Sequence, residues 1–334
     1  MPVTEEVFSI GDALDAADEE LTSGRIPAAA VLPTGFRLLD TYLGGGLRSG
    51  ELCVLGGPQG LGKTAFVLQV ARYAALIGNA AAVMSYEHDA ITLIERMIAL
   101  EAGDTLGVDG VPLRRVREAL EGSGRPGTTL AERLSNALGA AEAIDALRSY
   151  EDRLLLHRAS GTSTGLDEIR GVARMAGAHP GGPSLLVVDY LQKVYSPDAA
   201  SEADRITRIV DGLKDIALEQ DVAVLAVSAV DSSAAGPGRR MRVAHLGGSS
   251  SLAYEPDVIL MMNEKYDVVA RHHLVYDARA VDRFRDHVVI SIEKNRSGLA
   301  RIDLELRKRL EQSRFEREAN AVAEELLDER IYTQ

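Results

Sequence analysis

Residues 56–65, GGPQGLGKTA, have the types and spacing needed to hold phosphate. The part from 57 to 64 fits the pattern G-x-x-x-x-G-K-[ST], follows an apolar run and precedes a helical pattern. Glycines let the backbone wrap a phosphate with its N–H groups pointing inward, and a helix N-terminus adds favourable potential. We therefore predict a nucleotide-binding loop made of Gly57, Pro58, Gln59, Gly60, Leu61, Gly62, Lys63, Thr64 and Ala65.

Within and around this loop, four residues have the chemistry for ATP hydrolysis. Lys63 is expected to reach the β- and γ-phosphates of ATP, and Thr64 to bind Mg²⁺. Asp189 ends the apolar run PSLLVVD, where a carboxylate would hold Mg²⁺ through water. Glu87 ends the run AAAVMSYE and would orient and activate the attacking water. The alternative for both acids is a polar residue that only ends a strand.

The elements that must position these residues alternate along the chain. Apolar runs typical of buried strands occupy 52–57, 80–87, 183–192 and 222–229, and helical patterns separate them. HVVISIEKN and ARIDLEL, joined by RSG, predict a hairpin. This order predicts an α/β fold with a mostly parallel central sheet, helices on both faces and a C-terminal antiparallel hairpin. Ligands of such sheets bind at the carboxyl ends of the strands.

Three further segments lie outside this core pattern. Residues 1–32 are expected to form an acidic linker helix and a linker, with Ser9 as the helix cap and an apolar stripe of Ile10, Leu14, Ala17 and Leu21. That stripe packs either on its own domain or on a neighbouring subunit. Residues 103–129 are rich in Gly, Pro and charge, which predicts a surface insertion. Residues 316–334 are expected to form an acidic helix.

Composition restricts the setting of the protein. The only cysteine, Cys53, excludes an internal disulfide, and no apolar run is long enough for a membrane helix. With no secretory signal visible, we expect a cytoplasmic protein that does not contact a membrane. The net charge is −13, but residues 1–24 carry seven acids and no base, and 316–334 carry six acids and two bases. The acidity therefore belongs mainly to the two ends.

These motifs, in this order, resemble the ATPase domain of the DnaB-type replicative helicases. The resemblance covers about residues 33–315 and includes PTGFRLLDTYLGGGLRSGEL, GKTAF, SYEHDAITLIERMIA, LLVVDYLQ and EKNRSGLARIDLEL. LVVDYLQ and the late K-x-R-x-G are the specific ones. The resemblance implies a RecA-like fold for residues 33–315.

The resemblance also implies roles for individual residues. Glu87 matches the family's catalytic glutamate, and Lys63, Thr64 and Asp189 match its phosphate- and metal-binding residues. Lys294 and Arg296 match the pair that reaches the γ-phosphate bound by a neighbouring subunit. An arginine that one subunit supplies to the nucleotide of its neighbour implies a homo-oligomer, either a hexameric ring or a filament. The leading helix resembles the family's linker helix, which docks on the adjacent subunit.

Several positions depart from the family's pattern. The family's N-terminal domain, which serves primase interaction and ring assembly, has no counterpart in the residues before the motif region. At the end of the fourth strand Ser228 is kept, but Ala229 replaces a glutamine that senses the γ-phosphate. Charged residues give way to glycine and serine in HLGGSSSLAYEPD (245–257). The remaining candidates for contact with single-stranded DNA are Arg239, Arg240 and Arg242, which a solvated loop would explain as well.

Three functions follow as hypotheses. The first is a Mg-ATP-hydrolysing oligomeric ATPase, related to DnaB-type helicases, that translocates on single-stranded DNA. The second is a DnaB-like ATPase uncoupled from DNA, acting as an assembly, switch or regulatory protein. The third is a nucleotide-binding scaffold with little turnover.

Overall fold

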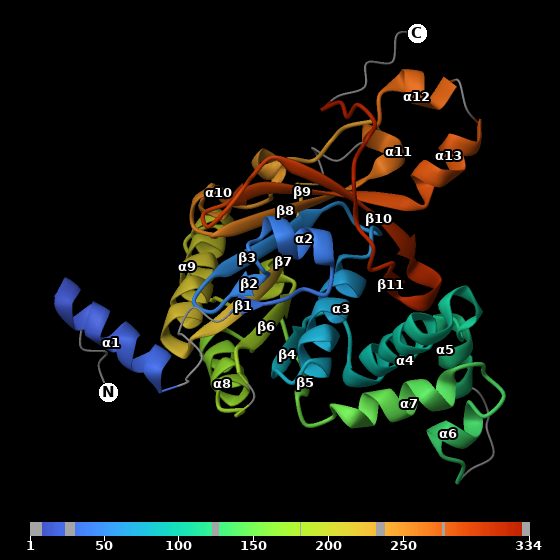
Figure 1. Ribbon diagram of the computed structural model, residues 1–334, viewed down its shortest axis with the longest axis horizontal. Helices are drawn as coiled ribbons and strands as arrows, with labels where there is room; N and C mark the ends of the chain where they lie inside the picture. Colours follow the sequence, from blue (N-terminus) through green and yellow to red (C-terminus); the bar gives the residue numbers. More distant parts are fainter. Residues whose placement is uncertain are drawn as a thin grey trace.

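The computed structural model describes residues 9–23, 31–121, 127–180, 182–231, 238–275 and 278–328 (Figure 1). Its strands are β1 (Val31–Leu32), β2 (Leu47–Arg48), β3 (Leu52–Gly57), β4 (Ala81–Ser85), β5 (Leu154–Arg158), β6 (Ser184–Asp189), β7 (Val222–Ala229), β8 (Val258–Glu264), β9 (His287–Asn295), β10 (Ile302–Arg309), β11 (Arg314–Phe315) and β12 (Asn320–Ala321). The α-helices are α1 (Ile10–Thr22), α2 (Arg37–Tyr42), α3 (Lys63–Leu76), α4 (Ala90–Leu106), α5 (Leu113–Glu121), α6 (Leu130–Arg133), α7 (Ala140–Ser149), α8 (Leu166–Gly177), α9 (Glu202–Gln220), α10 (Ser251–Tyr254), α11 (Lys265–Val268), α12 (Arg271–Val275) and α13 (Ala278–Arg285). Four short 3₁₀ turns are η1 (Gly107–Asp109), η2 (Leu191–Lys193), η3 (Val243–His245) and η4 (Leu310–Gln312).

One large sheet organises the chain, in the order β11-β10-β9-β8-β3-β7-β6-β4-β5. Strands β3 to β8 run parallel, and β9, β10 and β11 add an antiparallel edge. All residues of β3 and β6 are buried, which is why their sequences are continuously apolar rather than alternating. The expected α/β architecture with a C-terminal hairpin is confirmed.

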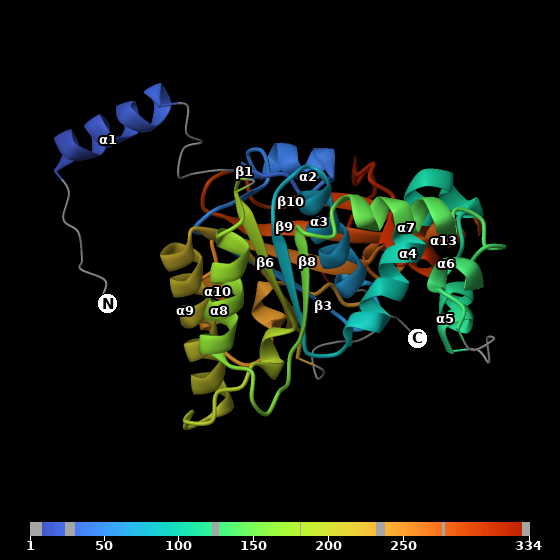
Figure 2. The ribbon, with the colours of Figure 1, turned by 90° about the horizontal axis from the view of Figure 1, so that it is seen from below.

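Helices cover both faces of this sheet, as Figure 2 shows. Alternate residues of β3 point to opposite faces, so Cys53 and Leu55 join the core under α2 and α3. Leu52 and Val54 join the second core, under α8, α9 and α10. Helices thus cover both faces of the sheet, and the carboxyl ends of the parallel strands are left uncovered.

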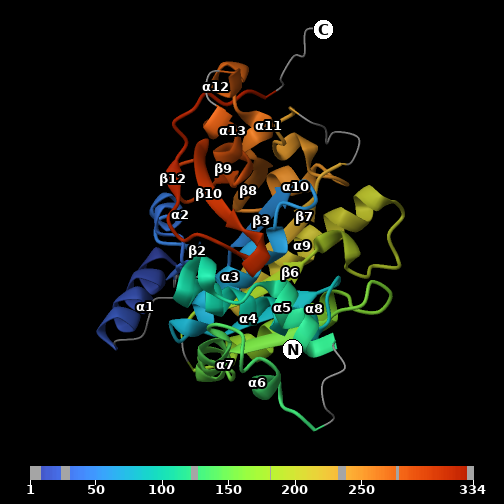
Figure 3. The same cartoon turned by 90° about the vertical axis from the view of Figure 1, so that its right-hand side faces the viewer.

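Helices α4 to α7 form a further layer beside the sheet (Figure 3). It has its own apolar cluster, in which Val111 and Val116 are buried against α4. In the described part of 103–129, predicted as a surface insertion, α4 runs on to Leu106 and α5 packs on it, so the segment is helical and partly buried. The apolar positions of α5 are few but face the cluster, while its many charges cover the outer side.

The predicted hairpin is present, with Leu304 opposite Ile290 in the pair β9–β10. The segment after it returns to the first core, where Phe315 stacks edge-on against Phe66 of α3. The Gln69 side-chain amide bonds both the N–H and the C=O of Phe315, each at 2.9 Å. These two bonds satisfy the backbone N–H and C=O of a buried residue, which would otherwise lack side-chain partners there.

The described part of the acidic tail, residues 316–328, is not a helix. Over residues 316–328 the chain is extended, pairs with β10 through β12, and bridges Val269 at Leu326. Its acids find cations on the body instead: Glu324 bonds the buried Lys265 at 2.7 Å, and Asp328 bonds Arg242 at 2.6 Å. These tertiary contacts override the local helical preference of the sequence.

Helix α1 lies apart from the rest of the chain (Figures 1 and 2). Ser9 caps it as expected, with Asp12 completing the capping box. Its stripe is uncovered, since Ile10 is 83%, Leu14 63% and Leu21 65% exposed. Of the linker expected before residue 33, residues 24–30 lie outside the described residues, and Val31–Leu32 form β1. Among those described, no helix combines the length and the apolar character needed to cross a bilayer.

A buried polar network ties α3, α4 and α7 together. The Arg72 guanidinium donates to Glu101 at 2.6 Å through Nε and more closely through a terminal nitrogen, and Tyr150 donates its hydroxyl to the same carboxylate. Arg72 is 5%, Glu101 1% and Tyr150 1% exposed. Breaking such a pair leaves a buried charge without a counter-charge.

We expect Glu101→Ala to lower the free energy of unfolding by about 3 kcal/mol, because Arg72 then stays buried beside only Asp104. Guanidinium-induced unfolding measures this change. The matched control is Glu118→Ala, which removes the exposed pair with Arg114 and is expected to cost less than about 1 kcal/mol. Equal losses for the two variants would contradict this assignment.

Candidate active site

The phosphate loop joins the central strand β3 to helix α3. Its glycines at 57, 60 and 62 have φ angles of 152°, 80° and 89°. A Cβ on Gly57 would lie 2.5 Å from the Met262 carbonyl oxygen, and one on Gly62 would lie 2.6 Å from a Leu310 methyl. Only glycine fits at these two positions, so the loop keeps an open backbone cradle at the start of α3.

Lys63 and Thr64 open α3 and face the cleft. Lys63 Nζ donates to the carbonyls of Gly57 at 2.7 Å and Pro58 at 2.6 Å, so the lysine folds back over the loop. Burial lowers the pKa of Lys63 to about 8, against the opposing effect of Asp189 and Glu87. An anion placed in the cradle would stabilise the charged form of this lysine.

The two acids end neighbouring strands. The register of β4 and β6 places Ser85 opposite Asp189, so Glu87, two residues beyond Ser85, follows at the same edge. Asp189 is 2% exposed and accepts a hydrogen bond of 2.7 Å from the Thr64 hydroxyl. Burial raises the pKa of Asp189, and the nearby charge of Glu87 raises it further.

These residues line one cleft of about 470 Å³ at the carboxyl edge of the sheet. Of the predicted loop, Gln59, Gly60, Gly62, Lys63, Thr64 and Ala65 line it, together with Glu87 and Asp189. Leu61 is buried at 7% exposure, so its side chain belongs to the core. A lysine, a hydroxyl and carboxylates around a glycine cradle form the donor set that a magnesium-bound phosphate chain needs.

Lys294 and Arg296 lie elsewhere. Since β9 runs antiparallel to β8, Lys294 stands opposite Ile259, near the start of β8. Lys294 Nζ and an Arg296 guanidinium nitrogen both donate to the Tyr254 carbonyl, at 2.5 and 2.7 Å. The pair therefore lies at the edge of the sheet opposite the cleft of its own chain. Arg296 is half-exposed there and also approaches Asp257, at 3.4 Å.

Strand β7 ends in the cleft with the methyl group of Ala229. The amide of Gln192 braces this strand end: its Nε2 donates to Ser228 Oγ at 2.9 Å, and its Oε1 accepts from Ala229 N at 3.1 Å. Gln192 thus ties the end of β7 to the turn that follows Asp189. Sequence reasoning missed this contact, although Gln192 belongs to the quoted motif LVVDYLQ.

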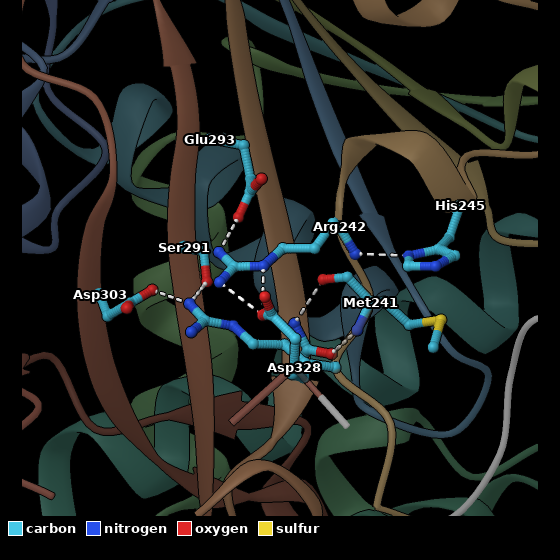
Figure 4. A network of polar contacts seen from close by, with 9 residues as sticks. Met241, Arg242, His245, Ser291, Glu293, Asp303 and Asp328 are labelled. Atoms are coloured by element: carbon cyan, nitrogen blue, oxygen red, sulfur yellow. Dashed lines mark hydrogen bonds and ion pairs between the residues drawn. The ribbon is translucent and has the colours of Figure 1, made fainter. Parts of the chain in front are cut away.

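The three arginines considered for DNA contact are not alike. Figure 4 shows the contacts of one of them, Arg242, with Glu293 and Asp328. Arg240 is 3% exposed and pairs with Asp303, which corrects the expectation that it faces solvent. Arg242 is held between Glu293 at 2.7 Å and Asp328 at 2.6 Å. Only Arg239 of the three is exposed. Both paired arginines neutralise acids of the hairpin and tail, so their charge is already used within the chain.

Several cleft residues were not predicted: His88, Arg96, Tyr190, Val227, Leu310 and Ser313. His88 and Arg96 belong to SYEHDAITLIERMIA, and the helical spacing after Glu87 is the signal that could have found Arg96. Leu310 and Ser313 come from the turn after β10, far away in the sequence, and no local pattern marks them.

The chain matches known proteins over most of its length. The sequence profile of the DnaB-like helicase C terminal domain matches residues 31–317. The replicative DNA helicase DnaB of Treponema pallidum (strain Nichols) is 28% identical over 234 residues, which are 70% of this chain and 48% of the relative. The chain thus spans about half the length of that relative.

Two solved structures share the fold. One, described as an ATPase domain, superposes with a TM-score of 0.71 at 22% identity, covering 93% of this chain and 99% of that one. A DnaB-like replicative helicase, described with its interactions with primase, gives 0.70 at 21% identity, covering 92% and 68%. Together with the profile match, these likenesses show that the chain belongs to the DnaB-like helicase C-terminal domain family and has its RecA-like fold.

Proposed function

We propose that this protein is an ATPase that binds Mg-ATP in the cleft at the end of β3 and hydrolyses it. The observation that carries the proposal is the meeting of Lys63, Thr64, Asp189 and Glu87 around one cleft. The loop N–H groups and Lys63 would hold the phosphates. Thr64 and Asp189, already joined by a hydrogen bond, would hold the metal.

Each residue then has one task in the reaction. Bound Mg²⁺ would supply positive charge that stabilises the phosphates as the terminal group is transferred to water. Glu87, at the strand end beside Asp189, would orient the attacking water and accept its proton. Lys63 would keep its charge against the phosphates rather than take part in proton transfer, because the ligand raises its pKa above the free value.

A second subunit would complete the site. Lys294 and Arg296 lie at the sheet edge opposite their own cleft, so they could act only on a nucleotide bound by another copy. The uncovered stripe of α1 supports the same arrangement, because an apolar helix face apart from the body needs a partner surface. We propose a homo-oligomer, either a hexameric ring or a filament, located in the cytoplasm.

We expect Lys63→Ala to abolish nucleotide binding and turnover, because the cradle loses its cation. Glu87→Gln should keep Mg-ATP binding but lower the ATPase rate about 100-fold or more, since an amide accepts no proton. A phosphate-release assay and a nucleotide titration measure the two properties. Glu142→Gln, on the exposed side of α7, is the matched control and should leave both unchanged. Full turnover in Lys63→Ala would refute the proposed site.

Mixing two inactive variants tests the shared site. Arg296→Ala should bind Mg-ATP normally but hydrolyse it slowly, and Lys63→Ala should not bind it. In a mixed oligomer, some clefts combine an intact Lys63 with an intact Arg296 from the neighbour. ATPase activity should therefore rise above the sum of the separate variants. Activity that stays at that sum at every mixing ratio would show that Arg296 does not act across subunits.

The proposal extends to contact with DNA. We propose that the oligomer contacts single-stranded DNA, as a translocating helicase would, with Arg239 as the exposed basic residue of the loop. The second candidate is an ATPase uncoupled from DNA. Two observations favour it. Arg240 and Arg242 are paired with acids of their own chain, and β7 ends in the cleft with Ala229, whose methyl group cannot form a hydrogen bond to a phosphate.

We expect single-stranded DNA to raise the ATPase rate, with a smaller increase for Arg239→Gln than for the wild type. The rate should be measured with and without DNA while the mass of the oligomer is recorded. Arg271→Gln, another exposed arginine, serves as the charge-matched control. An unchanged rate together with a nucleotide-dependent rise in mass would support the uncoupled ATPase instead.

A further inference from the structure

Arg96 enters the cleft from α4 without an acidic partner. Its closest polar contacts are His88 Nε2 at 3.4 Å and Ser313 Oγ at 3.5 Å, both long for hydrogen bonds. Its Nε atom is buried and has no hydrogen-bond partner. Within the described part of the chain, Arg96 makes no ion pair, although acidic residues are close by in sequence and space.

The neighbouring arginines show what is unusual about it. Arg72 of α3 is paired with Glu101 of α4, and Arg117 of α5 is paired with Glu95 of α4 at 3.1 Å. The three acids of α4, Glu95, Glu101 and Asp104, are therefore all paired with other arginines. Burial lowers the pKa of Arg96, and repulsion from Arg117 adds to the effect. A guanidinium in this setting has a desolvation cost that an anion in the cleft would offset.

The contact between Arg96 and His88 indicates the protonation state of the imidazole. A guanidinium can only donate, so His88 Nε2 must accept, which requires a neutral imidazole. Burial lowers the pKa of His88, and the charge of Arg96 acts in the same direction. His88 directly follows Glu87, so this long contact places the Arg96 guanidinium near the Glu87 side of the cleft.

We propose that Arg96 binds the terminal phosphate of the nucleotide held by its own chain. Among the described residues, Lys63 and Arg96 are the two strongly basic side chains that line the cleft, which they share with Glu87 and Asp189. The planar guanidinium can give two parallel hydrogen bonds to a phosphate, which a lysine cannot. Arg96 thus reports whether the third phosphate is present from within the subunit. The inference rests on the proposed function, since it requires a nucleotide in this cleft.

The expected consequence is a loss of discrimination between nucleotides. Arg96→Gln should weaken binding of a non-hydrolysable ATP analogue about 10- to 100-fold, the effect of losing a charge-assisted hydrogen bond. Binding of ADP should weaken by no more than about threefold. Arg96→Lys should lose part of the preference for the analogue, because lysine keeps the positive charge but cannot give two parallel hydrogen bonds. Calorimetric titration with Mg²⁺ present measures each affinity on the full chain.

Arg114→Gln is the matched control. It removes an exposed arginine of α5 that pairs with Glu118 and does not line the cleft, so both affinities should stay at the wild-type values. Equal losses of analogue and ADP in Arg96→Gln, or no loss of either, would overturn the role of Arg96 while leaving the ATPase proposal intact. Wild-type protein that binds neither nucleotide would overturn both. If Arg96→Gln does not fold, the Arg96→Lys titration decides by the same criterion.

Discussion

The hydrogen bond from Thr64 to Asp189 connects the phosphate loop with strand β6, across the intervening strand β7. It forms only if β6 keeps its register, because a slip of one residue would turn Asp189 toward the opposite face of the sheet. The same register sets Ser85, and so Glu87, beside Asp189. The buried, continuously apolar strands therefore do more than fill the core. They fix where two carboxylates and a hydroxyl meet, and the remaining cleft residues are arranged around that meeting point.

The polarity of the sheet has a second consequence. Parallel strands bring every carboxyl end to one edge, whereas the antiparallel β9 ends at the other. A chain built in this way carries a nucleotide cleft on one edge and a pair of basic residues, Lys294 and Arg296, on the opposite edge. Two unlike surfaces on opposite edges suit head-to-tail association, which produces rings when the rotation closes and filaments when it does not.

The sequence predicted the parts of the molecule that local rules govern. The loop from Gly57 to Thr64 and the acid after an apolar run are encoded within a few residues, so local patterns were enough to place both at the end of a strand. Arg96 and Ser313 could not be brought together in this way, because they come from segments far apart in the chain. The burial of Arg240 depends on Asp303, a residue of another strand, and therefore has no local signal.

The acidic tail shows how a correct charge pattern can predict the wrong structure. Ser291, Asp303 and Glu305 lie on one face of the hairpin, and cations from the body neutralise the acids: Arg240 pairs with Asp303, and Lys265 with Glu305. The tail adds a second acid to one of these cations, since Lys265 also binds Glu324.

Lys265 and Arg242 each hold a second carboxylate, from Glu324 and Asp328, because the tail is extended. A helix would turn most of the acids of the tail away from these cations. The ion pairs along the tail differ in how deeply they are buried. Lys265 is 1% exposed at one end, whereas Asp328 is 71% exposed where it meets Arg242. An exposed pair contributes little to stability and weakens with salt, while the buried pair holds the segment in place. A polyanion approaching Arg242 would therefore compete with Glu293 and the exposed Asp328, and not with the buried pair at Lys265.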